Sequence, residues 1–88
     1  MKKLLKFSAT WCVPCKLLSE TILRAGDKIT VPIEDIDIDA QPVLLQRYGI
    51  RSVPTLVLID TDDSIIGSSL KRITGNQTES KILDFINN

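Results

Sequence analysis

The sequence predicts a small α/β domain in the order β-α-β-α-β-β-α, with a four-stranded mixed sheet and helices on both faces. Three observations support this fold class. The chain has 88 residues, which is enough for one core but not for two. Apolar residues recur at helical spacing in some segments and alternate with polar residues in others. A cluster of turn residues separates the last two strand segments, so that they return as a hairpin.

The first half of the chain is predicted to form a strand–helix–strand unit. Pro14 fits the first turn of a helix, where its missing N–H is not needed, and Gly26 marks the end of that helix. The two strands of such a unit are parallel and have a right-handed crossover. The predicted elements are a strand at 4–7, a turn at 8–11, a helix from Cys12 with Leu17, Leu18, Thr21, Ile22 and Ala25 on its apolar face, a loop at 28–32 and a strand at 33–38.

The second half is predicted to contain a short helix, a hairpin and a final helix. Asp39 is the predicted N-cap of the short helix, and Gly49 closes it. Asn76 or Thr78 opens the final helix, and Glu79 would complete a capping box with Asn76. The predicted elements are the short helix with Val43, Leu44, Leu45 and Tyr48, a strand at 55–59, a turn at 61–64, a returning strand at 65–73 and a last helix with Ile82, Leu83, Phe85 and Ile86 on its buried face.

The composition is typical of a folded globular protein and argues against several classes of function. Hydrophobic residues make up 43% of the chain and charged residues 25%. Eleven Lys and Arg balance eleven Asp and Glu, so we expect no broad basic surface for nucleic acid or anionic lipid. The apolar runs are too short to span a membrane, and no signal-peptide core follows the first lysines, so we expect a cytoplasmic protein. Histidine, the commonest general base and metal ligand, is absent.

Two cysteines, Cys12 and Cys15, lie three positions apart in the segment Trp-Cys-Val-Pro-Cys-Lys at 11–16. This segment lies where the first predicted strand passes into the first helix. Unpaired N–H groups and the helix dipole at that position favour a thiolate on the first sulfur. The second cysteine, almost one turn later, is near enough to attack a mixed disulfide formed on the first. The spacing therefore indicates reversible thiol–disulfide exchange.

Other uses of the two thiols agree less well with the sequence. A structural disulfide would close a very small loop in a compartment that keeps thiols reduced. A zinc site needs about four ligands, and the chain supplies two thiols and no histidine, so we expect no metal. Two unrelated buried cysteines would not explain the tryptophan, the proline and the helix start around them. The acidic residues Glu34, Asp35, Asp37 and Asp39 are expected to form a solvated strand end rather than a metal site.

The chain resembles the thioredoxin family in two separated motifs, which occur in the correct order. The first is the active-site segment at 11–16, and the second extends from Ile-Asp-Ala-Gln-Pro at 38–42 to Tyr-Gly-Ile-Arg-Ser-Val-Pro-Thr at 48–55. The resemblance covers nearly the whole chain, but it begins at the second strand of a full thioredoxin. It therefore implies a minimal thioredoxin fold with strand order 2-1-3-4, the core that the family shares with glutaredoxins.

The resemblance also implies roles for individual residues. Cys12 would be the exposed nucleophile and Cys15 the buried resolving thiol. Val53-Pro54 would contain the family's cis-proline, which packs beside the disulfide, although a proline that only starts a strand is the alternative. The backbone of Val53 would pair with an extended client segment, and Trp11 is expected on the contact surface rather than in the core. The implied client-binding residues are Trp11, Val13, Pro14, Val53, Pro54, Thr74 and Gly75.

The chain departs from the family's pattern at several positions. Many thioredoxins carry a buried acid six residues before the first cysteine, paired with a lysine on the next strand. Here Lys6 occupies the first position and Asp35 the second, so we expect the pair with its charges exchanged beneath Cys15, as a candidate proton relay. The alternative is that Lys6 extends to solvent. Val13 replaces the glycine usual between the cysteines, and the closing hairpin is longer than in typical members.

We therefore expect a protein-disulfide reductase without a bound cofactor. The expected partners are disulfide-containing client proteins, among them ribonucleotide reductase by resemblance, with thioredoxin reductase or glutathione as electron donor. A glutaredoxin-like protein recycled by glutathione is the alternative. The short chain favours it, whereas the missing motif tyrosine and Thr-Gly-Asn at 74–76 in place of a Gly-Gly pair count against it. A binding subunit with incidental thiols is a second alternative. We expect a monomer with no nucleic-acid or membrane partner.

Overall fold

Four strands and three α-helices make up the described part of the chain, residues 1–62 and 64–88 of a computed structural model. The strands are β1 (Lys2–Ser8), β2 (Ile33–Asp37), β3 (Thr55–Asp60) and β4 (Ser68–Thr74). The helices are α1 (Val13–Ala25), α2 (Pro42–Arg47) and α3 (Glu79–Asn87), and the 3-10 segment η1 (Gly26–Lys28) follows α1. This is the predicted order of elements. Asp63, which the sequence predicts to lie in a turn, is outside the described residues.

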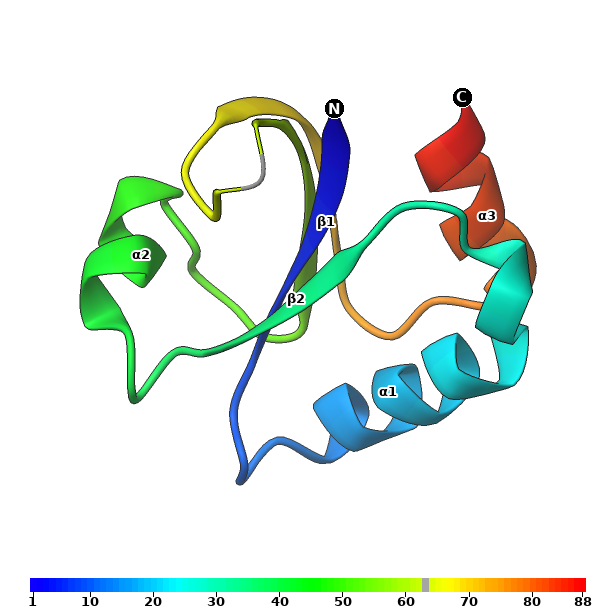
Figure 1. Cartoon of the computed structure of the whole chain (residues 1–88). Helices are drawn as coiled ribbons and strands as arrows, with labels where there is room; N and C mark the ends of the chain where they lie inside the picture. The colour runs from blue at the N-terminus through cyan, green and yellow to red at the C-terminus, as the bar shows by residue number, and fades with distance from the viewer. Residues whose placement is uncertain (63) are drawn as a thin grey trace.

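The strands form one mixed sheet in the order β2-β1-β3-β4, as the resemblance implies (Figure 1). β1 pairs in parallel with β2, where Phe7 lies opposite Ile36, and antiparallel with β3. β3 and β4 form the antiparallel hairpin, with a register shift between Leu58 and Ile59. β2 and β4 are therefore the outer strands of the sheet. β1, which leads to the cysteines, is an inner strand.

Helices cover both faces of the sheet, as predicted. In Figure 1, α2 lies on one side of the strands, and α1 and α3 lie on the other. Side chains alternate along β1, so Phe7 belongs to the core under α2, whereas Leu4 belongs to the core under α1 and α3. The core under α2 contains Leu5, Phe7, Ile36, Leu44, Tyr48, Ile50, Val57 and Ile59. The other core contains Leu4, Leu18, Leu56, Leu58, Ile82 and Ile86.

Helix α1 begins and ends where the sequence predicts. Cys12 is the N-cap, Pro14 lies in the first turn, and Gly26 ends the helix with a φ of 51°, a conformation that favours glycine. Leu18 is fully buried, but Leu17, which is predicted on the same apolar face, is 46% exposed. Successive residues differ by about 100° around a helix, so a stripe centred on Leu18 turns Leu17 toward solvent.

Helix α2 has a different cap from the one predicted. It begins after Gln41, whose side chain makes no cap hydrogen bond, so the prediction of Asp39 as N-cap is wrong. The Asp39 carboxylate instead accepts a hydrogen bond from the Trp11 Nε1–H at 2.9 Å. Gly49 follows the helix with a φ of 63°, as the predicted helix end requires.

Helix α3 and the hairpin before it also differ in part from the prediction. Thr78 is the N-cap, and its Oγ1 accepts the Lys81 N–H at 3.2 Å, so the alternative start at Asn76 and its capping box are wrong. Ile82 and Ile86 are buried, while the other two residues predicted on that face are only partly covered. β4 begins at residue 68 rather than 65, because the preceding residues form a loop that bonds to the end of α2.

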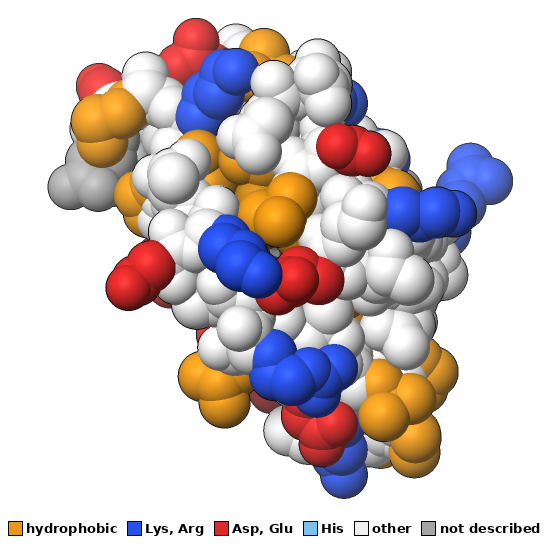
Figure 2. All heavy atoms as spheres, turned by 90° about the vertical axis from the view of Figure 1, so that its right-hand side faces the viewer, with side chains coloured by type: hydrophobic (Ala, Val, Ile, Leu, Met, Phe, Trp, Pro, Cys, Tyr) orange, Lys and Arg blue, Asp and Glu red, His pale blue; other side chains and the backbone are white. Residues whose placement is uncertain are grey.

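The surface carries both signs of charge in close mixture. On the face that Figure 2 shows, Lys and Arg side chains are interspersed with Asp and Glu, and apolar side chains form separate small groups. This distribution agrees with the equal numbers of basic and acidic residues in the chain. Within residues 1–62 and 64–88, no helix has the length and apolar character needed to cross a membrane.

Candidate active site

The two cysteines lie at the N-terminal end of α1 and form a disulfide, so the structure represents the oxidised state. Their Cα atoms are 5.2 Å apart. Cys12 is the N-cap of α1, and its Sγ accepts a hydrogen bond from the Cys15 N–H at 3.1 Å. The first-turn N–H groups and the helix dipole favour negative charge at this position. Opening the disulfide therefore leaves the Cys12 sulfur in a position that stabilises a thiolate.

Both cysteines are buried in this state, which differs from the expectation of an exposed Cys12. Cys12 is 4% exposed and Cys15 is 3% exposed. They form a small apolar cluster with Ala9, and Val53 packs against it. The Cys12 sulfur is bonded to Cys15 and accepts the Cys15 N–H, and Val53, which the fold brings from a distant loop, helps to cover it.

Apolar side chains beside the disulfide are exposed. Trp11 is 65% exposed and Val13 is 63% exposed, and Pro14 is also exposed. The expectation that Trp11 lies on the surface is therefore confirmed. The hydrogen bond from its indole to Asp39 fixes one edge of the ring. A buried disulfide with an exposed apolar rim is a surface that another protein can contact.

A loop with a cis peptide bond lies against the cysteines. The Val53–Pro54 bond is cis, as the resemblance implies. Val53 is partly buried and packs against the cysteine cluster, while Pro54 is fully buried. The Gly75 N–H donates to the Pro54 carbonyl at 2.8 Å, and Thr74 pairs with Thr55. The fold thus brings the end of β4 next to the cis-proline.

A groove of about 330 Å³ extends from Trp11 along the cis-proline loop. Its lining residues are Trp11, Ile38, Leu45, Ile50, Arg51, Ser52 and Val53. Trp11 and Val53 belong to the predicted set, and sequence reasoning missed the other five. The segment at 50–53 directly precedes Pro54, and this position in the sequence could have indicated that these residues line the groove. Ile38 and Leu45 have the apolar periodicity of core residues, so nothing in the pattern separates them from the core.

Lys6 and Asp35 form the predicted ion pair, with Nζ and Oδ1 2.7 Å apart. Lys6 is 7% exposed, so the alternative in which it extends to solvent is wrong. The Asp35 side chain is 70% exposed, so the pair reaches the surface. The Lys6 ammonium also donates to the Ser19 hydroxyl. Sequence reasoning missed Ser19, although its position four residues after Cys15 places both on one side of α1.

The acidic residues of β2 and the loop after it have protein partners. Lys3 pairs with Glu34 at 3.3 Å, and the Asp37 carboxylate accepts the Asp39 N–H at 2.9 Å. In the described residues, no three Cys, Asp or Glu side chains lie together as a metal site requires.

Comparison with known proteins adds to this geometry. The family model described as Thioredoxin matches residues 1–88. The chain belongs to the thioredoxin family. Thioredoxin from Mycolicibacterium smegmatis is 36% identical over 84 residues, which cover 91% of this chain and 70% of that protein. Thioredoxin from Rickettsia felis is 34% identical over 86 residues, which cover 96% of this chain and 77% of that protein.

Solved thioredoxin structures have the same fold. A mutant thioredoxin from Halobacterium salinarum NRC-1 has a TM-score of 0.82 and 33% identity, over 97% of this chain and 71% of that one. Chloroplastic thioredoxin z has a TM-score of 0.77 and 28% identity, over 98% of this chain and 75% of that one. The minimal thioredoxin fold is therefore confirmed.

Thioredoxin relatives and a Cys-x-x-Cys pair at disulfide distance together establish the chemistry. The protein is a thiol–disulfide oxidoreductase with protein-disulfide reductase activity. The glutaredoxin-like alternative is not favoured, since the named relatives are thioredoxins. Disulfide-containing proteins are the general kind of partner.

Proposed function

We propose that Cys12 is the nucleophile and Cys15 the resolving thiol. The Cys12 thiolate attacks one sulfur of a client disulfide, whose S–S bond breaks. A mixed disulfide forms, and the other client sulfur leaves as a thiolate that takes up a proton. Cys15 then loses its proton and attacks the Cys12 sulfur. This step forms the Cys12–Cys15 disulfide and releases the second client thiolate, so two electrons pass from this protein to the client.

The observation that carries this assignment is the 3.1 Å hydrogen bond from the Cys15 N–H to the Cys12 Sγ. It supports Cys12 as the attacking sulfur because only the N-cap sulfur receives a first-turn N–H in this way. Cys15 lies inside the helix and next to Cys12. Its position suits a thiol that attacks only the neighbouring sulfur.

We also propose that an extended client segment lies across the exposed rim of the disulfide. The exposure of Trp11 and Val13 and the contact of Gly75 with Pro54 support this position. The Val53 backbone would pair with the segment as an added strand does. The proposed client-binding residues are Trp11, Val13, Pro14, Val53, Pro54, Thr74 and Gly75.

The ion pair of Lys6 and Asp35 is our proposed proton relay for Cys15. The pair connects α1 with solvent, because Lys6 contacts Ser19 on α1 and Asp35 is exposed. Cys15 must lose a proton before it resolves the mixed disulfide, and Cys15 itself is 3% exposed. A buried ammonium beside the helix also favours the thiolate.

The electron donor and the clients are proposals based on the family. Thioredoxin reductase, or two molecules of glutathione that become one glutathione disulfide, returns two electrons to the Cys12–Cys15 disulfide, and ribonucleotide reductase is one client. The protein acts in the cytoplasm as a monomer, without a bound cofactor.

Insulin reduction tests these proposals. The protein is assayed with NADPH and thioredoxin reductase, and separately with glutathione, glutathione reductase and NADPH. Turnover with the first system supports thioredoxin reductase as donor, and turnover only with the second would assign glutathione instead. The double variant Cys12→Ser, Cys15→Ser is the control. It should have no activity, whereas a binding subunit with incidental thiols would keep its function.

A further inference from the structure

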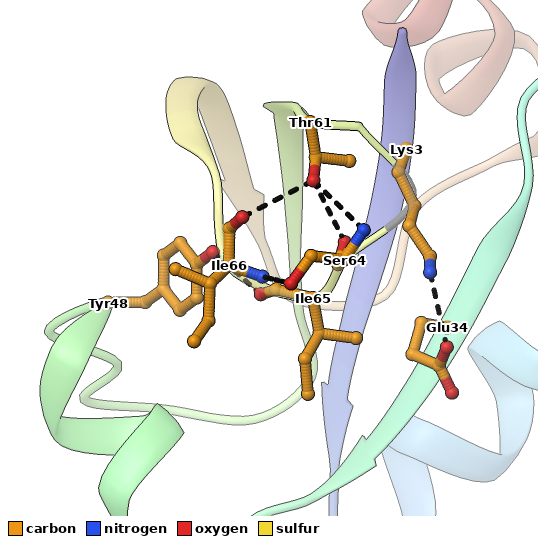
Figure 3. A network of polar contacts seen from close by, with 7 residues as sticks. All are labelled: Lys3, Glu34, Tyr48, Thr61, Ser64, Ile65 and Ile66. Atoms are coloured by element: carbon orange, nitrogen blue, oxygen red, sulfur yellow. Dashed lines mark hydrogen bonds and ion pairs between the residues drawn. The ribbon is translucent and has the colours of Figure 1, made fainter.

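The Tyr48 hydroxyl links the end of α2 to the loop between β3 and β4 (Figure 3). It donates a hydrogen bond to the Ile65 carbonyl at 2.9 Å and accepts one from the Gly67 N–H at 3.2 Å. Tyr48 is 6% exposed, and its ring lies 5.7 Å from the Phe7 ring, centroid to centroid. Packing therefore fixes the ring, and the ring in turn holds two backbone groups of the loop.

The loop has its own hydrogen bonds, which Figure 3 also shows. Thr61 Oγ1 accepts the Ser64 N–H at 3.1 Å and lies 3.3 Å from the Ile66 carbonyl oxygen. The Ser64 hydroxyl accepts the Ile66 N–H at 3.1 Å. A Cβ at Gly67 would lie 2.3 Å from the Asp60 carbonyl oxygen, so this close approach requires glycine. Thr61, Ser64 and Ile66 are thus hydrogen-bonded to one another next to the groups that Tyr48 contacts.

Tyr48 lies just before the segment that forms one wall of the groove. The Ile50 N–H donates to the Leu45 carbonyl at 3.0 Å, and residues 50–53 then line the groove up to the cis peptide. Trp11 also lines the groove, beside the disulfide. A displacement of the end of α2 would therefore change the groove, whereas the cysteines are at the start of a different helix, α1.

We infer that Tyr48 is a positioning residue for client binding. Through the Tyr48 hydroxyl, the β3–β4 loop holds in place the groove wall at 50–53. The inference rests on the proposed function, in which a client segment lies along this rim. The hydroxyl itself is bonded to the loop, so it acts on the client only through the wall. Without the two hydrogen bonds of the Tyr48 hydroxyl, residues 50–53 take more conformations. A client must then order these residues when it binds, and this conformational entropy cost weakens binding.

Tyr48→Phe tests this positioning role, because it removes the hydroxyl and keeps the ring. We expect the KM for insulin to rise roughly two- to tenfold, the range that ordering one more group on binding implies. The kcat, and the rate with the small disulfide 5,5′-dithiobis(2-nitrobenzoate), should stay within about twofold of wild type. Amide exchange at Ile50 and Val53 should become faster. An unchanged KM overturns the inference, as does an equal loss with both disulfides.

A second variant tests the same positioning role from the loop. Thr61→Val removes the loop hydrogen bonds that the Thr61 hydroxyl makes with Ser64 and Ile66, and it should also raise the KM for insulin selectively. Thr21→Val is the matched control, since the Thr21 hydroxyl donates to the Leu17 carbonyl within α1, and it should change neither constant. If Tyr48→Phe does not fold, Thr61→Val decides. If the wild-type protein cannot reduce insulin, the proposed function is refuted. If the wild-type protein is active and Thr61→Val has the same KM for insulin, only the inferred positioning role of Tyr48 and the loop is refuted.

Discussion

Lys6 on β1 and Asp35 on β2 are register partners whose charged groups lie 2.7 Å apart, and only Lys6 is buried. The two ends of this ion pair therefore lie in different dielectric surroundings. Water screens the exposed Asp35 carboxylate strongly, whereas the Lys6 ammonium acts on α1 from inside the protein. Removal of the lysine charge should consequently affect the active site more than removal of the carboxylate charge.

Lys6→Met should move the midpoint of the pH–rate profile for insulin reduction to higher pH, by a few tenths to about one unit, because the ammonium favours a thiolate. Asp35→Asn should move it less, since Lys6 keeps its hydrogen bond to Ser19. The measurement is the initial rate between about pH 6 and pH 9, a range that brackets ordinary thiol pKa values. Profiles that coincide with wild type in both variants would exclude the pair from proton transfer.

Cys15→Ser should trap a mixed disulfide between Cys12 and the client, because the resolving thiol is absent. Cys12→Ser should trap none and reduce activity to background. Mass spectrometry of the intact protein after incubation with a disulfide-containing client, without added reductant, distinguishes the two. The roles of the cysteines would be reversed if the adduct formed on Cys15 in the Cys12→Ser variant instead.

The pKa of Asp60 lies below its usual range, because the N-terminal ammonium of Met1 donates a hydrogen bond to its carboxylate at 2.8 Å and adds a positive charge. A carboxyl group whose folded-state pKa is lowered stabilises the fold above the unfolded pKa of about 3.8 to 3.9 and loses this effect as the pH falls through the folded value. Asp60→Asn should therefore lower stability slightly at neutral pH and not at all in strong acid. Urea unfolding at both pH values measures this difference.

Acetylation of the N-terminal amine should raise the pKa of Asp60 toward its ordinary value. The same change should reduce the stability difference between wild type and Asp60→Asn, since only the smaller effects of Lys2 and the Thr61 N–H then lower the pKa of Asp60. NMR titration of the Asp60 carboxyl group provides the test, and identical midpoints with and without acetylation would contradict the proposed cause.

Leu18→Ala should lower the free energy of unfolding by about 2 to 5 kcal/mol, because it opens a cavity in the core under α1 and α3. Leu23→Ala is a matched control on the same helix. Leu23 is 83% exposed, so its replacement should change the free energy by no more than about 0.5 kcal/mol. Urea unfolding of both variants gives the comparison, and equal losses would show that α1 is packed differently.

The junction between β1 and α1 was predictable because its determinants are local. Within a helix Pro14 is best accommodated in the first turn, Gly26 accepts the positive φ at the helix end, and the two cysteines flank the helix start. Sheet order was predictable for a different reason. Two motifs far apart in the chain match one family, and the family's connectivity then determines which strands are neighbours.

Several of the errors concern contacts between residues distant in sequence, unlike the local ones at Leu17 and Asn76. Asp39 has the residue type of an N-cap, but Trp11, 28 positions earlier, donates to its carboxylate. Ile65 belongs to an apolar segment that resembles a strand, but its carbonyl accepts the Tyr48 hydroxyl and remains in the loop. A tertiary hydrogen bond overrides the local preference in both cases, and no periodicity records it. The burial of Cys12 has a similar origin, since Val53 reaches it only through the fold.

The outer position of β2 affects how the molecule behaves at high concentration. A free strand edge is a template on which a strand of a second copy can add. Glu34 and Asp35 are respectively 46% and 70% exposed in their side chains, so this border carries carboxylates. Lys3 and Lys6 of β1 pair with these two carboxylates, so a second strand that added here would have to accommodate charged side chains held in ion pairs, which disfavours stacking into fibrils along this border.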